Sequence, residues 1–319
     1  MVEGRPGAPP LLVIAGPTAT GKTGLSIEIA SRLRSEGIPA EIISADSRQV
    51  YRGLDIGTAK VPPAARRGIP HHGLDLVEPV EPFSVVDFVR HARGVLSGIA
   101  ERGGIAILVG GTGLYCRGMA RGLDADALPF DAEIRASIEA GITANGLAPA
   151  VERLRTLAPT LASRIDLANP RRVARALEIA ELRGDAPPPA PLGYDGPVAW
   201  VGLRVEASLH LQWIANRARE QFDAGLIEEA GALRKRFDPG LPAFSAIGYR
   251  EAWAVLDGTL AREAAIDLDA RRNVDFAKRQ ATWFRSEPGI EWLDATANPA
   301  ERTIAVTQQL LAAALAVAR

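Results

Sequence analysis

An α/β fold with a parallel sheet at its centre is predicted by three observations on this chain of 319 residues. Short, mainly apolar runs of strand length alternate with longer segments of helical periodicity, which is the pattern of β-α-β crossover units. The runs lack the regular polar alternation of half-exposed strands, so both faces of the sheet should be covered. The long segment between the third and fourth runs carries helical patterns alone. It predicts a mostly helical insertion.

The individual elements follow in chain order. The first strand, residues 11–15, lies between prolines and a glycine, and its five side chains are all apolar. A helix over 23–35 follows, because apolar side chains recur there every four positions along one face. The next elements predicted are a strand at 41–44, a helix within 84–102, a strand at 105–109 and a strand at 198–203.

These elements predict three regions. Residues 1–120 should form the first part of the α/β core, and residues 121–195 the helical insertion, which includes a stiff proline linker at 187–191. Residues 196–319 should supply the last core strand and then a helical C-terminal region that completes the core.

Composition excludes several classes of protein. The 37 basic and 38 acidic residues balance, which rules out a uniformly basic chain but leaves room for a local basic face. Cys116 is the only cysteine, so a disulfide framework and a cysteine zinc cluster are excluded. No apolar run reaches the roughly 18 residues of a membrane helix, and the first residues lack a signal-peptide pattern. We therefore expect a cytoplasmic protein with no membrane contact and no obligate protein partner.

A phosphate-binding motif follows the first predicted strand. Residues 16–23, Gly-Pro-Thr-Ala-Thr-Gly-Lys-Thr, match G-x-x-x-x-G-K-[ST] in full, between a strand and a helix as the motif requires. Its backbone N–H groups and the helix N-terminus attract phosphate oxygens. Lys22 adds a full charge, and the Thr23 hydroxyl can hold Mg²⁺. The core is thus predicted to resemble a P-loop NTPase, the alternative being a glycine-rich turn that binds nothing.

One part of the usual P-loop machinery is missing from the sequence. A phosphoryl-transfer enzyme of this class uses a second acid, often at the end of a later strand, to hold Mg²⁺. The strand at 105–109 ends in Gly110-Gly111-Thr112-Gly113, with no acid. Asp46, after the second strand, is the nearest candidate, since ligands collect at the carboxyl ends of parallel strands. Asp46 is either catalytic or the cap of a helix.

Two basic stretches favour nucleic acid as a partner. Residues 164–175 hold four arginines against one aspartate, and residues 271–285 hold five basic residues against one aspartate, with three aromatic residues interleaved. Arginine forks for phosphates and aromatic rings for stacking are typical of RNA recognition. Either stretch alone could be a solvated helix face, but the two occur together with a phosphate loop.

Eight segments, taken together, resemble the tRNA dimethylallyltransferases, also called tRNA isopentenyltransferases. They occur in the family's order between residues 11 and about 293, and the ordered set is specific although most of its members are modest alone. The segments are 16–23, 44–51, 55–60, 70–75, 108–115, 169–178, 247–251 and 277–285.

The resemblance implies an activity. Members of that family transfer a dimethylallyl group from dimethylallyl diphosphate to N6 of the adenine at tRNA position 37, beside the anticodon, and release diphosphate. The phosphate loop would then hold the prenyl diphosphate with Mg²⁺ as cofactor, and ATP would bind at best incidentally. The tRNA anticodon stem-loop would be the macromolecular partner. The C-terminal zinc finger of some relatives is absent.

The resemblance also implies roles for residues. Asp46 matches the general base, Thr23 the Mg²⁺ ligand, and Arg217 an arginine near the diphosphate, although Trp213 stands nearby at a usual arginine position. The implied diphosphate-binding residues are Gly16, Pro17, Thr18, Ala19, Thr20, Gly21, Lys22 and Thr23.

The tRNA contacts are implied in the same way. The adenine must leave its stack to reach the donor, and Ser47 and Gln49 lie where the family reads this base. Thr112 could instead cap a helix, and Arg135 could be one of many solvated arginines. The full implied set is Asp46, Ser47, Arg48, Gln49, Thr112, Arg135, Arg171, Arg172, Val173, Ala174, Arg175, Lys278 and Arg279.

Two other functions compete with this interpretation. A small-molecule kinase would use the same loop with ATP, and a non-catalytic RNA-binding module would carry the loop as a vestige. A kinase should show an acid at the tip of a strand and an arginine-rich lid, whereas the sequence shows a helical insertion and basic stretches. Intact Lys22, Thr23 and Asp46 argue against the vestigial module.

Overall fold

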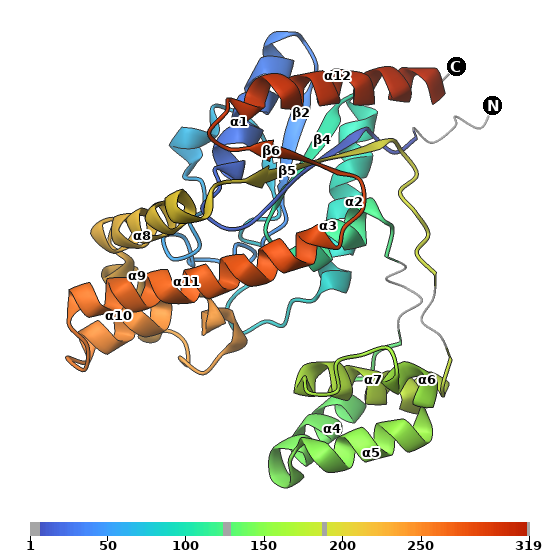
Figure 1. The fold of residues 1–319 in the computed structure, drawn as a ribbon, viewed down its shortest axis with the longest axis vertical. Coiled ribbons are helices and arrows are strands. Elements are labelled where there is room, and N and C mark those ends of the chain that lie inside the picture. The colour runs from blue at the N-terminus through green and yellow to red at the C-terminus, as the bar shows by residue number, and fades with distance from the viewer. Residues whose placement is uncertain (1–6, 124–128, 187–189, 318–319) are drawn as a thin grey trace. The chain divides into compact units, whose positions relative to one another are not determined.

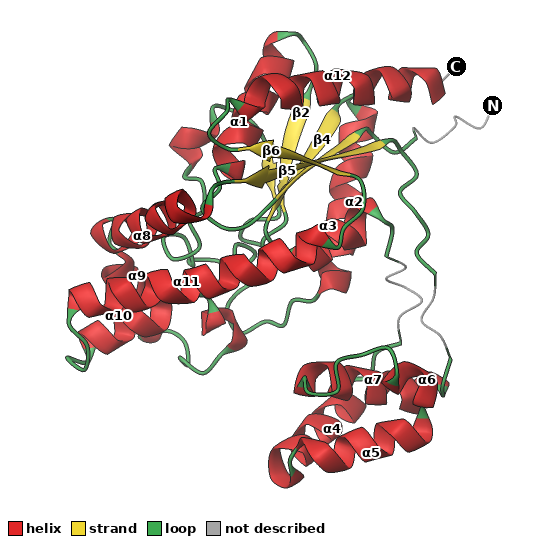
Figure 2. Cartoon of the chain, in the orientation of Figure 1, coloured by secondary structure: helices red, strands yellow, loops and turns green. Residues whose placement is uncertain are grey.

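A single sheet of six parallel strands forms the core of the computed structural model, which describes residues 7–123, 129–186 and 190–317 (Figures 1 and 2). The order across the sheet is β3-β2-β4-β1-β5-β6, so the strand before the phosphate loop is central. Its register pairs Leu11 with Ala106 on one side and with Val198 on the other. The predicted α/β fold is confirmed. The strands are β1 (Leu11–Ala15), β2 (Ala40–Ser44), β3 (His71–His72), β4 (Ile105–Gly110), β5 (Val198–Arg204) and β6 (Ile290–Asp294).

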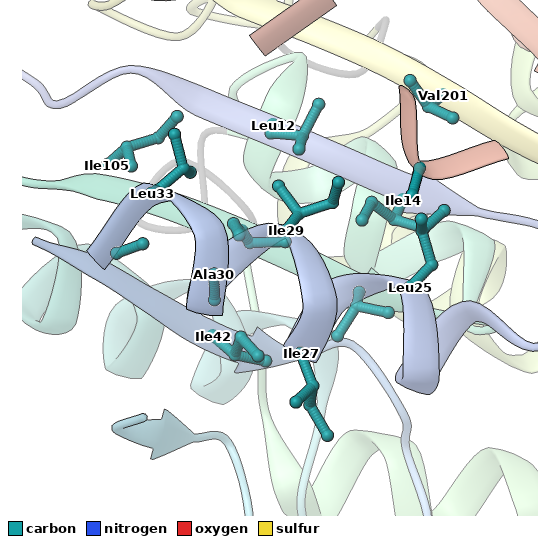
Figure 3. Close-up of a cluster of buried hydrophobic side chains, with 14 of the residues drawn as sticks. Leu12, Ile14, Leu25, Ile27, Ile29, Ala30, Leu33, Ile42, Ile105 and Val201 are labelled. Atoms are coloured by element: carbon teal, nitrogen blue, oxygen red, sulfur yellow. The ribbon is translucent and has the colours of Figure 1, made fainter. Parts of the chain in front are cut away.

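One face of the sheet is covered by α1 (Lys22–Ser35) and α12 (Pro299–Val317). Leu12, Ile14 and Val201 from the strands meet Leu25 and Ile29 of α1 in one apolar cluster, which Figure 3 shows from the side of α1. Alternate strand residues point to opposite faces, and the other face is covered by α2 (Val85–Glu101) and α3 (Gly113–Ala120), both of which contact β4. The central strands are buried on both sides because helices lie on both.

Two strands differ from the sequence-based expectation. The strand β3, which pairs with β2, consists of His71–His72 alone and was not predicted. The strand β6 lies in the C-terminal region, where only helices were expected. The prediction that residues 198–203 form the last core strand is therefore wrong, since β6 follows β5 and pairs with it. Both strands are sheet edges and are only partly buried, so neither needs the continuous apolar run that identifies a central strand.

The helical insertion forms a compact unit of its own, residues 124–192. Its described core contains Ile138, Leu154 and Leu177. Asp131 and Asn169 cap its two longest helices by accepting backbone N–H groups of the first turn. Of the predicted linker, residues 187–189 lie outside the described part of the chain. The helices are α4 (Ala132–Asn145), α5 (Leu147–Leu157), α6 (Pro159–Ala162) and α7 (Pro170–Arg183).

The chain leaves and re-enters the α/β unit at one point. The Gly193 N–H donates to the Arg121 carbonyl at 3.2 Å. Gly122 and Gly193 both have positive φ, and a Cβ on Gly122 would lie 1.8 Å from the Gly193 oxygen. Only glycine fits so close an approach of two backbones.

A layer of helices follows β5 and completes the α/β unit (Figure 1). The long helix α11 packs against α8 and α10, and α9 packs against α10. Within the described residues, no helix has the length and apolar character needed to cross a membrane. The helices are α8 (Ala207–Asp223), α9 (Leu226–Arg234), α10 (Tyr249–Leu256) and α11 (Arg262–Arg285), with the short 3-10 helices η1 (Pro63–Arg66) and η2 (Pro242–Ser245).

Candidate functional site

The phosphate loop joins the central strand β1 to α1, and its backbone is tightly curled. Gly16, Ala19 and Gly21 have φ of 140°, 59° and 82°. A Cβ on Gly16 would lie 2.7 Å from the Leu203 carbonyl oxygen, so the loop starts with a glycine for lack of space. The first helical residue is Lys22. The loop therefore has the strand-to-helix geometry of an anion site at a helix N-terminus.

Lys22 is a partly buried cation beside this loop. Its ammonium donates to the Pro17 carbonyl across the loop. Burial and the neighbouring Arg217 charge together lower the pKa of Lys22 to about 7, although Asp46 acts in the opposite direction. Phosphate oxygens at the loop would favour the charged form. Cys116, buried nearby, has its thiol pKa raised by burial to about 12, which makes it a poor nucleophile.

Arg217, on α8, is the second cation of the site. Its Nη1 donates to the Thr18 Oγ1 at 2.9 Å, which ties the guanidinium to the phosphate loop. Burial lowers the pKa of Arg217, while Asp46 and Asp269 favour the charged form. Asp46 is the carboxylate that most favours the charged form of both Lys22 and Arg217, so the three side chains belong to one site.

Asp46 follows β2 and begins a turn, not a helix. Its Oδ1 accepts the Arg48 N–H at 2.8 Å, and no other hydrogen bond to it is found among the described residues. The helix-cap interpretation of Asp46 is therefore wrong, and its second oxygen is available to a ligand.

Three cavities of the α/β unit share Arg217 as a wall residue. One, of about 950 Å³, is lined by the phosphate loop from Ala19 to Thr23, and by Trp213. A second, of about 100 Å³, lies against Lys22 and Asp46. The third, of about 400 Å³, is lined by Asp46, Ser47, Arg48, Thr112 and Arg279. The loop, the two cations and Asp46 therefore line neighbouring cavities that share wall residues.

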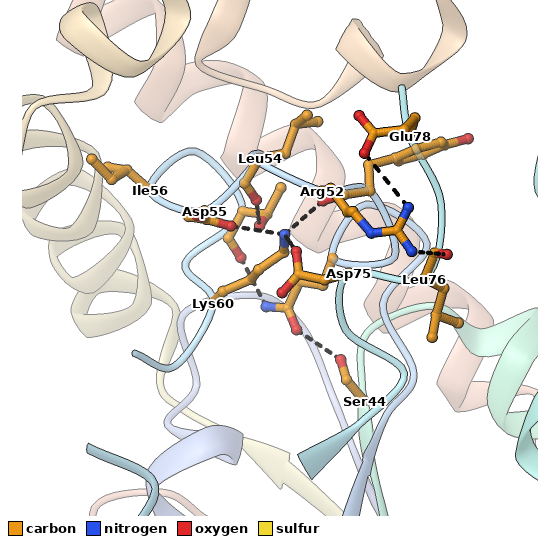
Figure 4. Close-up of polar contacts among 12 residues, drawn as sticks. Ser44, Arg52, Leu54, Asp55, Ile56, Lys60, Asp75, Leu76 and Glu78 are labelled. Atoms are coloured by element: carbon orange, nitrogen blue, oxygen red, sulfur yellow. Dashed lines mark hydrogen bonds and ion pairs between the residues drawn. The ribbon is translucent and has the colours of Figure 1, made fainter. Parts of the chain in front are cut away.

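The segment after Asp46 is held in place by a buried ammonium. The side chain of Lys60 is 4% exposed and donates to the Tyr51 carbonyl at 2.6 Å and to the carboxylates of Asp55 and Asp75 (Figure 4). This one cation joins three parts of the chain around the site. Lys60 ends segment 55–60 of the family resemblance, and its role could not be predicted from that segment.

Gln49 was predicted to read the target base, and in this structure its amide is already paired. Its Oε1 accepts the Ser44 hydroxyl at 2.7 Å, and its Nε2 donates to the Thr58 carbonyl at 2.9 Å. These bonds orient the turn that carries Asp46. Base reading by Gln49 stays a prediction and would require the amide to exchange a partner.

Thr112 connects two loops of the site. It occupies the N-cap position of α3, but its side chain makes no capping bond there. Its Oγ1 instead accepts the Ser47 N–H at 3.0 Å, and so links the end of β4 to the Asp46 turn. The alternative that Thr112 merely caps a helix is wrong.

Several residues that shape the site were missed by sequence reasoning. Glu229 on α9 accepts the N–H groups of Ile56 and Gly57 and the Tyr249 hydroxyl, and Gln221 donates to the Ile56 carbonyl. They fix the loop that forms one wall of the largest of these three cavities. Neither Glu229 nor Gln221 belongs to a recognisable local motif. Both form hydrogen bonds with backbone groups of a loop more than 150 positions away in the sequence.

Within the helical unit, the predicted tRNA contacts divide into two groups. Val173 and Ala174 are buried in the unit's core, so their side chains are closed to tRNA, and their predicted contact with tRNA would have to be made by the backbone. Arg171 and Arg172 are exposed in the first turn of α7. The helical spacing explains the difference, since the fourth and fifth residues of α7 turn towards the core.

Arg135 and Arg175 both bind the carboxylate of Glu178, whose side chain is 0% exposed. Burial acts to raise the pKa of Glu178, but hydrogen bonds from Arg175 and Arg135 outweigh it and hold the pKa below its ordinary value. Arg135 is therefore not simply a solvated arginine. Arg135 also pairs with Glu139 at 3.7 Å, so the two guanidinium groups face two carboxylates between α4 and α7.

On α11, the predicted basic face is partly exposed. Lys278 is 72% exposed and lies 3.2 Å from Asp275, and Arg279 lines the third cavity with its guanidinium 5.8 Å from the Phe276 ring centroid. Phe284 is fully buried and Trp283 packs under Arg117, so two of the three interleaved aromatics serve the fold. Phe276 is the one that lines a cavity.

The described residues include no cluster of three or more His, Cys, Asp or Glu side chains that could hold a metal ion. The Thr23 hydroxyl is exposed at the phosphate loop. A single hydroxyl fits Mg²⁺, which keeps waters and takes substrate phosphate oxygens as its other ligands.

Comparison with known proteins gives concordant matches. The family model described as IPP transferase matches residues 49–287. The tRNA dimethylallyltransferase of Geobacillus kaustophilus is 41% identical over 288 residues, 89% of this chain and 90% of that protein. The enzyme of the same name from Thiobacillus denitrificans is 40% identical over 303 residues, 92% of this chain and 95% of that protein.

Solved structures agree. A tRNA isopentenylpyrophosphate transferase from Bacillus halodurans superposes with a TM-score of 0.68 at 36% identity, covering 95% of each chain. A eukaryotic dimethylallyltransferase, whose structures show it acting on tRNA, superposes with a TM-score of 0.78 at 25% identity, covering 95% of this chain and 79% of that one.

Proposed function

This chain belongs to the IPP transferase family, and from that premise we propose that it transfers a dimethylallyl group from dimethylallyl diphosphate to N6 of the adenine at position 37 of tRNA. The carbon–oxygen bond of the donor breaks, a carbon–nitrogen bond forms, and diphosphate is released. The observation that carries this proposal is that the phosphate loop, Arg217 and Asp46 line the same two neighbouring cavities.

The cations of the site would stabilise the diphosphate leaving group. As the donor bond breaks, negative charge grows on the diphosphate, and preorganised cations and N–H groups at that point lower the barrier. Lys22 and Arg217 lie beside the loop, one across it and one bonded to it. Mg²⁺ held by Thr23 would add further positive charge there.

Asp46 would activate the acceptor, which is the N6 amine of adenine. The exocyclic amine of adenine is a weak nucleophile, so a base that accepts its proton as the new bond forms assists the reaction. Asp46 keeps one oxygen free of hydrogen bonds within the described chain. The third cavity, with Arg48 and Thr112 in its wall, would receive the flipped base.

We propose that tRNA contacts the exposed basic residues of α7, those of α11, and the third cavity. We also propose that the reaction takes place in the cytoplasm. Arg171, Arg172, Lys278 and Arg279 are the phosphate-contact candidates, since their side chains are exposed or line a cavity.

The donor is expected to be used without a nucleotide. Purified protein incubated with Mg²⁺, tRNA and dimethylallyl diphosphate should yield dimethylallyladenosine at position 37, detected by mass analysis of the digested nucleosides. The strand β4 ends in Gly110 and is followed by Gly111-Thr112-Gly113, without the acid of the ATPase type, so ATP should not be needed. A strict ATP requirement, or phosphate transfer to a small molecule, would favour the kinase alternative instead.

Salt dependence should identify the tRNA contacts. Each phosphate contact releases counterions, so log affinity should fall with log salt concentration by about 0.9 per neutralised phosphate. Changing Arg171, Arg172, Lys278 or Arg279 singly to alanine should flatten that slope by about one unit, measured by filter binding. Arg34→Ala, an exposed change in the last turn of α1, serves as the control. If the slope stays constant in all four variants, these residues are solvated and tRNA binds elsewhere.

A further inference from the structure

Thr18, in the middle of the phosphate loop, is held through all of its polar groups. Its N–H donates to Gln280 Oε1 at 2.7 Å, its carbonyl oxygen lies 2.8 Å from His210 Nε2, and its hydroxyl accepts from Arg217. The three partners come from α8 and α11, about 190 to 260 positions along the chain. The loop is therefore fixed by helices that its own sequence motif does not include.

Gln280 is the partner whose chemistry is most specific. Besides accepting the Thr18 N–H, its Nε2 donates to the Gly111 carbonyl at 3.0 Å, so the two ends of one amide bridge the loops after β1 and β4. The side chain is buried, at 6% exposed. A carboxylate could accept the N–H but could not donate to the carbonyl.

The space around this amide is also specific. A Cβ on Gly111 would lie 2.1 Å from the Gln280 Nε2, so Gly111 is what allows the bridge to form. Gly111 has no positive φ. Alanine could therefore take its backbone conformation and would act only by displacing the Gln280 amide.

We propose that Gln280 is a positioning residue for the donor: it holds the Thr18 peptide, and with it the phosphate loop and Arg217, in the arrangement that receives the diphosphate. The proposal rests on the function proposed above. Because the Thr18 N–H is already paired, the diphosphate is bound by the remaining loop N–H groups and by Lys22, and Thr18 can offer it only the hydroxyl hydrogen. The role is distinct from that of the neighbouring Lys278 and Arg279, which the sequence assigns to tRNA.

The expected effect is on donor binding. Leaving a buried N–H unpaired weakens the arrangement it supports, so Gln280→Met should raise the Kd for inorganic pyrophosphate about 10-fold. The donor KM should rise by a similar factor with kcat within about threefold, because an interaction made equally in ground and transition states alters KM alone. The Kd for tRNA should stay within about twofold. Pyrophosphate binding is measured by calorimetry and tRNA binding by filter binding.

A second route to the same change guards against misfolding. Gly111→Ala should displace the amide and weaken pyrophosphate binding to the same degree, and the double variant should be no weaker than either single one. Lys278 lies two positions before Gln280 on α11, but its side chain is exposed. Lys278→Met should therefore weaken tRNA binding and leave pyrophosphate binding intact. Thr307→Val removes a buried hydrogen bond from α12, which lines none of the three cavities, and controls for lost stability in thermal melting.

The two proposals fail in different ways. If wild-type protein binds pyrophosphate and modifies tRNA, but Gln280→Met and Gly111→Ala bind pyrophosphate as tightly as wild type, the positioning role is overturned and the function stands. If both variants weaken pyrophosphate binding only as much as Thr307→Val does, Gln280 is a structural residue. If wild-type protein binds no pyrophosphate and modifies no tRNA, the function itself is overturned.

Discussion

Asp46→Asn should lower kcat by about 10²–10⁴-fold, the range for a lost general base. Asparagine keeps an oxygen in place to accept the Arg48 N–H, so the turn after β2 should be preserved. What is lost is a group that can take the proton from adenine N6. Single-turnover transfer with saturating donor and tRNA measures the chemical step directly.

Pyrophosphate binding to Asp46→Asn distinguishes a catalytic role of Asp46 from a positioning role. Asp46 faces Lys22 and Arg217, so removing its charge takes a carboxylate away from the diphosphate site. Pyrophosphate should bind Asp46→Asn as tightly as wild type or more tightly. Asp46→Ala, which also loses the Arg48 bond, should be no more active than Asp46→Asn. A wild-type rate in Asp46→Asn would make the carboxylate a turn residue without a catalytic role.

Arg217→Gln should lower kcat/KM by about 10²–10³-fold, as expected when a preorganised group facing a developing anion is removed. The guanidinium is bonded to the phosphate loop through Thr18 and is flanked by all three cavities. Arg217→Lys retains the charge but not the planar fork, so it should recover only part of the loss. Steady-state kinetics with varied donor gives the comparison.

The matched control lies on the same helix. Arg219 is exposed and pairs with Glu263 at 2.7 Å, a surface ion pair that contributes little. Arg219→Gln should leave kcat/KM within about twofold. Equal losses in Arg217→Gln and Arg219→Gln would mean that α8 is sensitive to any change, and Arg217 would lose its assigned role.

The central fold could be predicted because its signals are local. A strand buried on both faces is apolar along its length, as β1 and β4 are, and the phosphate loop is a contiguous motif whose flanking elements confirm it. Asp46 could be placed because parallel strands bring their carboxyl ends to one edge. The edge strands β3 and β6 have weaker apolar patterns, because each pairs with a neighbouring strand along one edge alone and is only partly buried.

The supporting residues could not be predicted because their partners are remote. Gln280 lies in a basic segment and was interpreted with it, yet it faces the phosphate loop 262 positions away. Val173 and Ala174 show the converse: they lie between exposed arginines in the sequence but turn inwards on α7. Which face of a helix meets which element depends on packing that no single segment specifies.

The close approach of Gly122 and Gly193 has a consequence for how such an enzyme diversifies. Because the chain leaves the α/β unit and returns to it through hydrogen-bonded neighbours, the α/β unit closes its sheet regardless of what lies between. A folded segment with adjacent ends adds little to the loop-closure entropy of its host. The helical unit can therefore lengthen, shorten or change its surface charge without altering the register of β5 on β1. Acceptor recognition can vary in this way while the transfer chemistry stays constant.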